Sequence, residues 1–264
     1  MRAVHMLGAG HMGGAILYGL RQQMKGTDSL RVVEVDAERS AKYSTDGFRV
    51  STRLERLEDD DIVVLAVPPQ QFEQALVQNE LLKRHRGPVI SVMAGITLHT
   101  LTRELGHCNV VRSIPNTPSQ VGEGVTLYYA PTQARPELTA AAQQVFGAIG
   151  LVIRVEDEAQ IDSGTALAGG GPALVAFFAD ALQEYAHEEG FDARQAELIA
   201  TQLLHGTARL IRETGKPAWQ VCKDVQTKGG TTERAIDTFV DADIKGIVKA
   251  ALRAAARRSV ELGK

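Results

Sequence analysis

The chain has 264 residues, of which 44% are hydrophobic, and its formal net charge at pH 7 is −3. This length exceeds the need of one doubly wound α/β unit, so we expect two folded domains with a core in each. The small net charge excludes a general field for nucleic acid or anionic lipid. The two cysteines, Cys108 and Cys222, have no metal-binding spacing and are too few for a disulfide framework.

The sequence shows no segment that would direct it to or anchor it in a membrane. No basic-then-apolar leader precedes the first predicted strand, and we expect no apolar run near the roughly 18 residues that a membrane span needs. We therefore expect a cytoplasmic protein without nucleic-acid, membrane or metal partners.

A glycine-rich stretch, "MLGAGHMGG", lies between an apolar run at 3–7 and a helical pattern at 11–24. In the spacing G-x-G-x-x-G, Gly8 permits a tight turn, Gly10 lets a pyrophosphate approach the backbone, and Gly13 lets helix and strand pack closely. The helix start adds free N–H donors. The pattern predicts the phosphate turn of a dinucleotide-binding βαβ unit, and an ordinary strand-to-helix turn is the alternative. The expected cofactor contacts are Gly8, Ala9, Gly10, His11, Met12 and Gly13.

Apolar runs alternate with helical patterns as far as residue 155, which is typical of a parallel sheet covered by helices. About eight strands are expected in all. The seven runs that can be named are 3–7, 30–35, 61–67, 88–92, 109–114, 125–129 and 151–155. The predicted helical crossovers are 54–58, 70–82, 98–105 and 136–149.

Strand patterns disappear after residue 155 and helical patterns replace them. The sequence thus predicts a Rossmann-like doubly wound sheet over 1–157 and an all-helical domain over 158–264. Helices are expected over 172–190, beginning at Pro172, and over 193–213, where Asp192 and Gln195 form a capping box. Apolar residues of the latter helix spread over more than one face. This favours an interlocked homodimer over the alternative, packing against the first domain.

The loops that follow the strands should face one crevice, because ligands of open α/β sheets bind outside the carboxyl ends of the strands. Two prolines bracket Asn116 and Thr117 and stiffen their loop, which is either a ligand contact or a rigid crossover. The further cofactor contacts expected from these loops are Asp36, Arg39, Ala66, Val67, Pro68, Ala94, Gly95, Pro115 and Asn116.

Cofactor choice depends on the residue that closes the second strand. We expect this to be Asp36, which would accept from the ribose 2′-OH of NAD and repel the 2′-phosphate of NADP, whereas nearby Arg39 would favour NADP. Both NAD and NADP are therefore expected to serve.

Two further glycine clusters precede predicted helices in the second half. Bare N–H groups at a helix start suit an anionic group such as a carboxylate. For the cluster at 225–236 the alternative is a polar linker with Thr231 or Thr232 as helix cap. The expected substrate contacts are Gly170, Gly171, Pro172, Thr227, Lys228, Gly229, Gly230 and Thr231.

The segments "GAGHMGGAI", "SVMAGI", "VRSIPNTPSQVGEG", "GGGPAL" and "KGGTTERAI" occur in the order and approximate spacing of pyrroline-5-carboxylate reductase. The chain resembles that family along essentially its whole length. The resemblance implies a Rossmann domain that takes NAD(P)H as hydride donor and a helical domain that forms an interlocked dimer, often assembled into a decamer. It also implies that the cofactor meets the partner's helical domain at the active site, and that the reaction is the last step of proline biosynthesis.

The chemistry that the resemblance implies is hydride transfer to the C=N carbon of 1-pyrroline-5-carboxylate. We assign the substrate carboxylate to the backbone N–H groups of Lys228–Thr231 and the ring nitrogen to the hydroxyl of Thr232, the predicted catalytic residue. If the imine binds already protonated, positioning is the main task of the protein.

The chain departs from the family pattern at three places, of which Thr227, where the family commonly has a serine, is the mildest. The usual Ser-Gly-Ser-Gly-Pro-Ala-Tyr is here Ala168–Leu174 without the two hydroxyls and the phenol, and the usual lysine after the fourth strand is Pro68. These losses leave open a related imine reductase or a non-catalytic NAD-binding sensor. A 3-hydroxyacid dehydrogenase would also open with such a glycine loop, but it needs a lysine in the first long helix of the second domain, and residues 175–187 contain none.

Overall fold

The computed structural model describes residues 2–24 and 27–262, and the chain divides into two compact units. The first runs to Pro172 and takes in the C-terminal stretch from Arg253, and the second is Ala173–Leu252. This division falls later in the chain than the predicted domain boundary at 157, because the first helix after the sheet remains fastened to the sheet. Buried Arg112 donates to Glu158 at 2.9 Å and to Asp162 at 2.6 Å. Residues 263 and 264 of the predicted second domain lie outside the described residues.

The first unit is built on an eight-stranded sheet with the order β3-β2-β1-β4-β5-β6-β7-β8. All neighbours pair in parallel except β6 and β7, which are antiparallel. The strand order reverses between β1 and β4, where doubly wound sheets bind their ligands. The strands are β1 (Val4–Leu7), β2 (Leu30–Val33), β3 (Arg49–Ser51), β4 (Ile62–Leu65), β5 (Val89–Ser91), β6 (Val110–Ile114), β7 (Gly124–Tyr129) and β8 (Gly150–Arg154).

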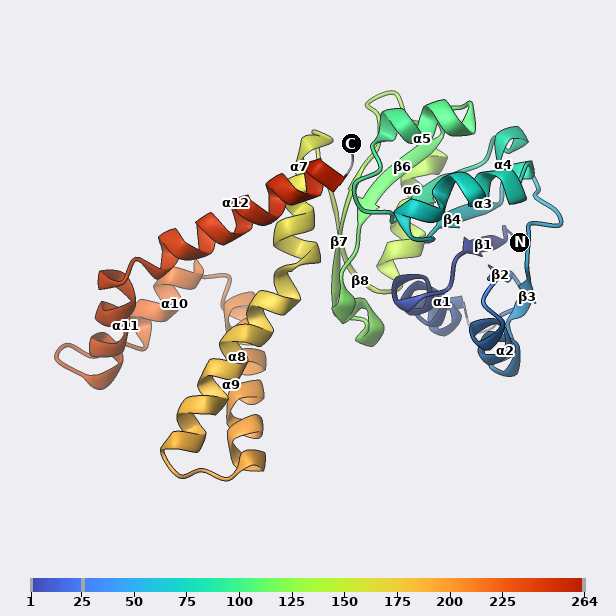
Figure 1. Cartoon of the computed structure of the whole chain (residues 1–264). Coiled ribbons are helices and arrows are strands. Elements are labelled where there is room, and N and C mark those ends of the chain that lie inside the picture. The colour runs from blue at the N-terminus through green and yellow to red at the C-terminus, as the bar shows by residue number, and fades with distance from the viewer. Residues whose placement is uncertain (1, 25–26, 263–264) are drawn as a thin grey trace. The chain divides into compact units, whose positions relative to one another are not determined.

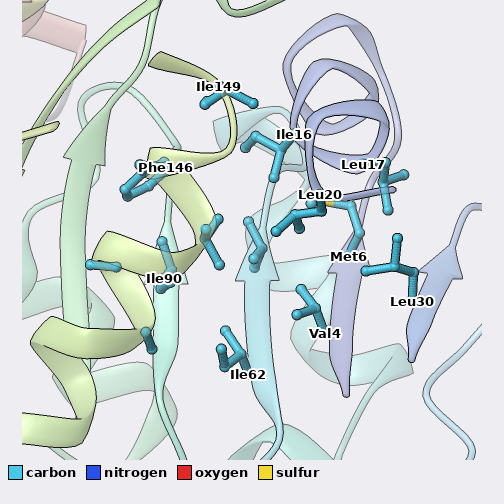
Figure 2. Close-up of a cluster of buried hydrophobic side chains, with 14 of the residues drawn as sticks. Val4, Met6, Ile16, Leu17, Leu20, Leu30, Ile62, Ile90, Phe146 and Ile149 are labelled. Atoms are coloured by element: carbon cyan, nitrogen blue, oxygen red, sulfur yellow. The ribbon is translucent and has the colours of Figure 1, made fainter. Parts of the chain in front are cut away.

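Helices cover both faces of this sheet (Figure 1). On one face, Ile16, Leu17 and Leu20 of helix α1 (His11–Met24) pack over Val4 and Met6 of β1 (Figure 2). Burial of each such side chain contributes about 1.5–3 kcal/mol. Helices α2 (Ala37–Thr45) and α6 (Pro136–Gly147) share that cluster, whereas the opposite cluster belongs to α3 (Phe72–Gln78), α4 (Leu81–Arg84) and α5 (Leu98–Leu105). Strands β1, β2, β4, β5 and β6 thereby place neighbouring residues in two cores.

Several local expectations need correction. Strand β3 and helix α2 were not predicted, and residues 54–58 form no helix. The helix expected over 70–82 is divided into η1 (Pro69–Gln71), α3 and α4. Buried Asn79 explains two of these differences, because its Oδ1 accepts from the Leu54 N–H at 2.7 Å and its Nδ2 donates to Ala75 O at 2.8 Å. This amide ends α3 and holds the segment at Leu54 in an extended course.

The chain continues as helices after β8. The capping box predicted at Asp192 and Gln195 is confirmed, with Gln195 N–H donating to Asp192 Oδ1 at 2.9 Å. Gly215, in the left-handed conformation with φ 64°, ends the same helix. These elements are α7 (Ala159–Gly164), the π-helical turn η3 (Thr165–Gly169), α8 (Gly171–Glu188), α9 (Ala193–Thr214), α10 (Ala218–Asp224), α11 (Thr231–Asp241) and α12 (Ile244–Leu262).

Candidate active site

The glycine-rich turn between β1 and α1 has the geometry that the spacing predicts. Gly8 has φ +86°, and a Cβ there would lie 2.8 Å from Ala66 O. A Cβ on Gly13 would lie 2.2 Å from Gly8 O, so helix and strand pack too closely for any side chain. A Cβ on exposed Gly10 would meet no atom within 4 Å. Only Gly10 therefore keeps space free on its ligand side.

A cavity of about 760 Å³ opens beside this turn at the carboxyl ends of β1, β2 and β4. The first-turn N–H groups of α1 have no intrahelical partners, so this end of α1 can bind an anion. A cavity of this size suits a cofactor. Residues predicted to contact the cofactor that line it are Gly8, Gly10, His11, Met12, Arg39, Ala66, Val67 and Pro68.

The acid at the end of β2 is Glu34, not Asp36. Strand β2 ends at Val33, and Glu34 is only 4% exposed. Asp36 begins α2 instead, where its Oδ1 accepts from the Arg39 N–H at 2.9 Å. The expectation that Asp36 closes the strand was wrong, because β2 covers only Leu30–Val33 of the apolar run at 30–35. An aspartate directly before a helical pattern is a capping signal, and this signal at Asp36 favours Glu34 as the strand-end acid.

The Glu34 carboxylate accepts hydrogen bonds from the glycine-rich turn and from the start of α2. Its Oε2 accepts from the Ala9 N–H and its Oε1 from the Asp36 N–H, each at 2.9 Å. Arg39 Nε lies 3.1 Å from Oε2. Burial acts to raise the pKa of Glu34, but the hydrogen bonds from Arg39, Asp36 and Ala9 outweigh it and hold this pKa below its ordinary value. The crevice therefore contains a fixed negative charge.

A second cavity of the first unit, about 430 Å³, gathers the loops after β4 and β5 with the turn η3. It brings together Ala94 and Gly95, predicted cofactor contacts, with Gly170, a predicted substrate contact from a separate motif. The π-helical geometry of η3, in which Gly170 N–H donates to Thr165 O at 2.9 Å, is typical of functional sites. Arg258 and Ser259 of α12 also line this cavity. Sequence reasoning missed them, because they lie about ninety positions further along the chain than Gly170.

Asn116 is buried and links three segments of the first unit. Its Oδ1 accepts from the Val125 N–H at 2.9 Å, and its Nδ2 donates to Ala168 O at 3.1 Å. In a regular helix Ala168 O would bond to the N–H of residue 172, which is a proline and has none. Asn116 supplies the missing donor and fixes η3. A direct cofactor contact of Asn116, or of its neighbour Pro115, stays a prediction.

The second unit carries the other predicted site, the turn before α11. Gly229 has φ +74°, and Gly230 is the N-cap of α11 without a side-chain cap bond. The Gly229 N–H donates to Glu233 Oε2 at 2.6 Å, so a carboxylate already occupies one donor of this turn. Thr232 is half-buried in the first turn of α11. The other nominated residues, Thr227, Lys228 and Thr231, are exposed.

Large apolar side chains are exposed across the second unit. They include Phe177, Leu182, Leu198, Leu203, Leu210 and Phe239. One helical stretch of the described chain, Ala159–Glu188, is long and apolar enough to span a membrane by length and composition, with a mean hydropathy of 1.4. The expectation that no run approaches that length was wrong, because α7, η3 and α8 join into one stretch. Such a helix occurs equally where an apolar face packs against a second protein.

Comparison with known proteins agrees with both halves of this description. Residues 3–95 match a family model described as NADP oxidoreductase, coenzyme F420-dependent. Together with the doubly wound sheet and its crevice, this defines an NAD(P)-dependent oxidoreductase. Residues 158–262 match a model described as pyrroline-5-carboxylate reductase dimerisation. The pyrroline-5-carboxylate reductase of Vibrio alginolyticus is 32% identical over 267 aligned residues, covering 100% of this chain and 98% of the relative. The chain belongs to the pyrroline-5-carboxylate reductase family.

Solved structures show the same fold. A pyrroline-5-carboxylate reductase from Coxiella burnetii superposes with a TM-score of 0.89 at 31% identity, covering 100% of this chain and 99% of that one. A pyrroline carboxylate reductase from Plasmodium falciparum, solved with NADP bound, superposes with a TM-score of 0.87 at 22% identity, covering 100% and 98%. The predicted family and fold class are confirmed, and these matches favour this family over the 3-hydroxyacid dehydrogenases.

Proposed function

We propose that the chain reduces 1-pyrroline-5-carboxylate to L-proline with NAD(P)H, as its membership of the reductase family implies. The observation that carries this proposal is the glycine turn with open Gly10 beside a cavity of about 760 Å³. A Cβ at Gly10 would enter the space beside the N–H donors of α1, so the residues present fit a pyrophosphate. When bound, the cofactor supplies a hydride for the C=N carbon of the substrate.

The chain's own residues then position the imine. In this proposal the N–H groups at Lys228–Thr231 hold the substrate carboxylate, and the Thr232 hydroxyl bonds the ring nitrogen, with Thr227 as a further contact. The bond from the Gly229 N–H to Glu233 supports the first assignment, because a backbone N–H of this turn donates there to a carboxylate oxygen. Gly170, Gly171 and Pro172 are proposed as further substrate contacts. The imine binds already protonated, so the reaction depends mainly on holding the cofactor and the imine in the right relative position.

The exposed apolar surface of the second unit supports a homodimer. Burial of such side chains between two copies gains about 25 cal/mol per Å². We further propose assembly of dimers into a decamer, a cytoplasmic location, and no partner among membranes or nucleic acids. The covering of α8 in the dimer would explain its apolar composition.

The direct test follows NADH and NADPH absorbance with 1-pyrroline-5-carboxylate as substrate, with proline identified as product. Oxidation of either cofactor that depends on the imine and yields proline is the expected result. Cofactor binding without turnover would favour the alternative, a non-catalytic NAD-binding sensor. The observation that favours this alternative is the absence of the two hydroxyls at Ala168 and Gly170.

A further inference from the structure

The carboxylate of Glu34 is surrounded by protein nitrogen atoms. Oε2 accepts from the Ala9 N–H at 2.9 Å and lies 3.1 Å from Arg39 Nε in an ion pair. Oε1 accepts from the Asp36 N–H at 2.9 Å and from Arg39 Nη2 at 3.2 Å. A carboxylate offers about four lone-pair positions, so three hydrogen bonds and one ion-pair contact surround it. A ligand can reach Glu34 only if one donor withdraws.

The groups around the Glu34 carboxylate differ in how freely they can move. Ala9 and Asp36 donate from the backbone, one within the glycine turn and the other at the start of α2. The Arg39 side chain is 48% exposed, and both Arg39 and Glu34 line the cofactor cavity. Arg39 is therefore the donor that can leave, whereas the two backbone bonds keep the carboxylate facing the cavity.

We propose that Glu34 and Arg39 form an opposed pair that sets the cofactor preference, with Glu34 selecting NADH and Arg39 retaining some affinity for NADPH. The inference rests on the proposed use of a dinucleotide. A ribose with a free 2′-OH can donate to the acceptor positions that Arg39 vacates. A 2′-phosphate would attract the Arg39 guanidinium, but it would bring its charge towards a carboxylate that two backbone bonds prevent from turning away. NADH is thus the better-bound cofactor.

Asp36 provides a matched control for this assignment. It carries the same charge two positions along the chain, but it serves as the N-cap of α2 and is absent from the lining of the cavity. Its contact with Arg39 is an exposed ion pair with 3.7 Å between Asp36 Oδ2 and Arg39 Nη1, and such surface pairs contribute little. Asp36→Asn removes a negative charge near the site and keeps a good capping residue. A general electrostatic effect would respond to both acids, whereas a direct contact would respond to Glu34 alone.

The experiment measures the dissociation constants of NADH and NADPH by fluorescence titration at one ionic strength and without substrate. The proteins compared are the wild type, Glu34→Gln, Arg39→Met and Asp36→Asn. We expect tighter NADH binding by the wild type. Glu34→Gln should move the ratio of the two constants towards NADPH, and Arg39→Met should move it towards NADH, each about tenfold or more. Asp36→Asn should leave the ratio within about twofold.

The ratio is taken on one preparation, so a partly unfolded fraction cancels. Because the exposed Arg39 side chain is not part of the core, the Arg39→Met arm tests the proposal even if Glu34→Gln fails to fold. A wild type that prefers NADPH, an Asp36→Asn shift as large as that of Glu34→Gln, or an unchanged ratio in Arg39→Met would overturn it. Wild-type protein that binds neither cofactor would overturn the proposed function as well, whereas opposed shifts without imine turnover would support the pair and reject only the reaction.

Discussion

Gly10 and Gly13 belong to the same motif but have opposite surroundings. Because space is free at Gly10 and Asn is well tolerated where a helix begins, Gly10→Asn should keep the fold. The variant should weaken dinucleotide binding at least about tenfold, because its side chain would fill the space through which the phosphate approaches the backbone. Gly13→Ala places a Cβ 2.2 Å from Gly8 O and should instead destabilise the protein. Titration with NADH and urea denaturation of both variants separate the two effects. Wild-type affinity in folded Gly10→Asn would mean that the turn is purely structural.

Buried imidazoles lie towards the other end of the sheet from the crevice. Burial lowers the pKa of His5 and His85, although both rings contact Asp61. Burial, with the nearby charges of Arg86 and His85, lowers the pKa of His107 to about 4. The unfolded chain, with histidine pKa values of about 6.5, then binds more protons than the folded one between about pH 6.5 and 4. These three histidines therefore contribute stability above that window.

The free energy of unfolding should fall as pH falls from about 6.5 to about 4. Asp61, whose pKa is also lowered despite its burial, contributes stability that is lost only below its ordinary value of 3.8, so the two effects occupy different windows. His107→Gln should flatten the slope between about pH 6.5 and 4 in urea denaturation. Exposed His99→Gln is the control. An unchanged slope in His107→Gln would exclude this ring as a source of the pH dependence.

At the scale of elements, the start of α11 decides the role of Thr232. The N-cap of α11 is Gly230 and no side-chain cap bond is present there, so the hydroxyl of Thr232 is not needed to cap the helix. Thr232→Ala should lower kcat/KM for the imine about ten- to a hundredfold, the worth of a hydrogen bond to a charged group, with little change in Tm. Thr232→Ser should recover most of the activity. A loss of Tm without a kinetic loss would remove Thr232 from the mechanism.

At the scale of the whole molecule, the exposed apolar side chains of α9 predict self-association. Leu203 is 52% exposed, and Leu203→Glu would bury a charge if this surface is covered by a second copy. We expect the wild type to sediment as a dimer or larger at about micromolar concentration, and the variant to dissociate at least about tenfold more readily. Ala208→Glu places the same charge about 140° around the helix and is the control. Monomeric wild-type protein would contradict the proposed dimer.

Elements with local signals can be predicted from the amino-acid sequence. The glycine turn at Gly8–Gly13, the capping box at Asp192 and Gln195, and the helices at His11–Met24 and Leu98–Leu105 were predicted because sterics, capping and apolar periodicity act within a few residues. Family membership also followed from the order of short motifs, which needs no knowledge of contacts. These features are fixed before the chain folds back on itself.

Contacts between residues far apart in the chain could not be predicted from local sequence and became known from the fold. The Glu34 carboxylate accepts from the Ala9 N–H, 25 positions earlier in the chain. Asn79 kept residues 54–58 out of a helix through a bond to Leu54 across the same separation. Arg112 holds α7 on the sheet, and the division between the two units therefore falls after α7, at Pro172. Buried polar groups must find partners wherever the fold supplies them, and no window of local sequence contains both members of such a pair.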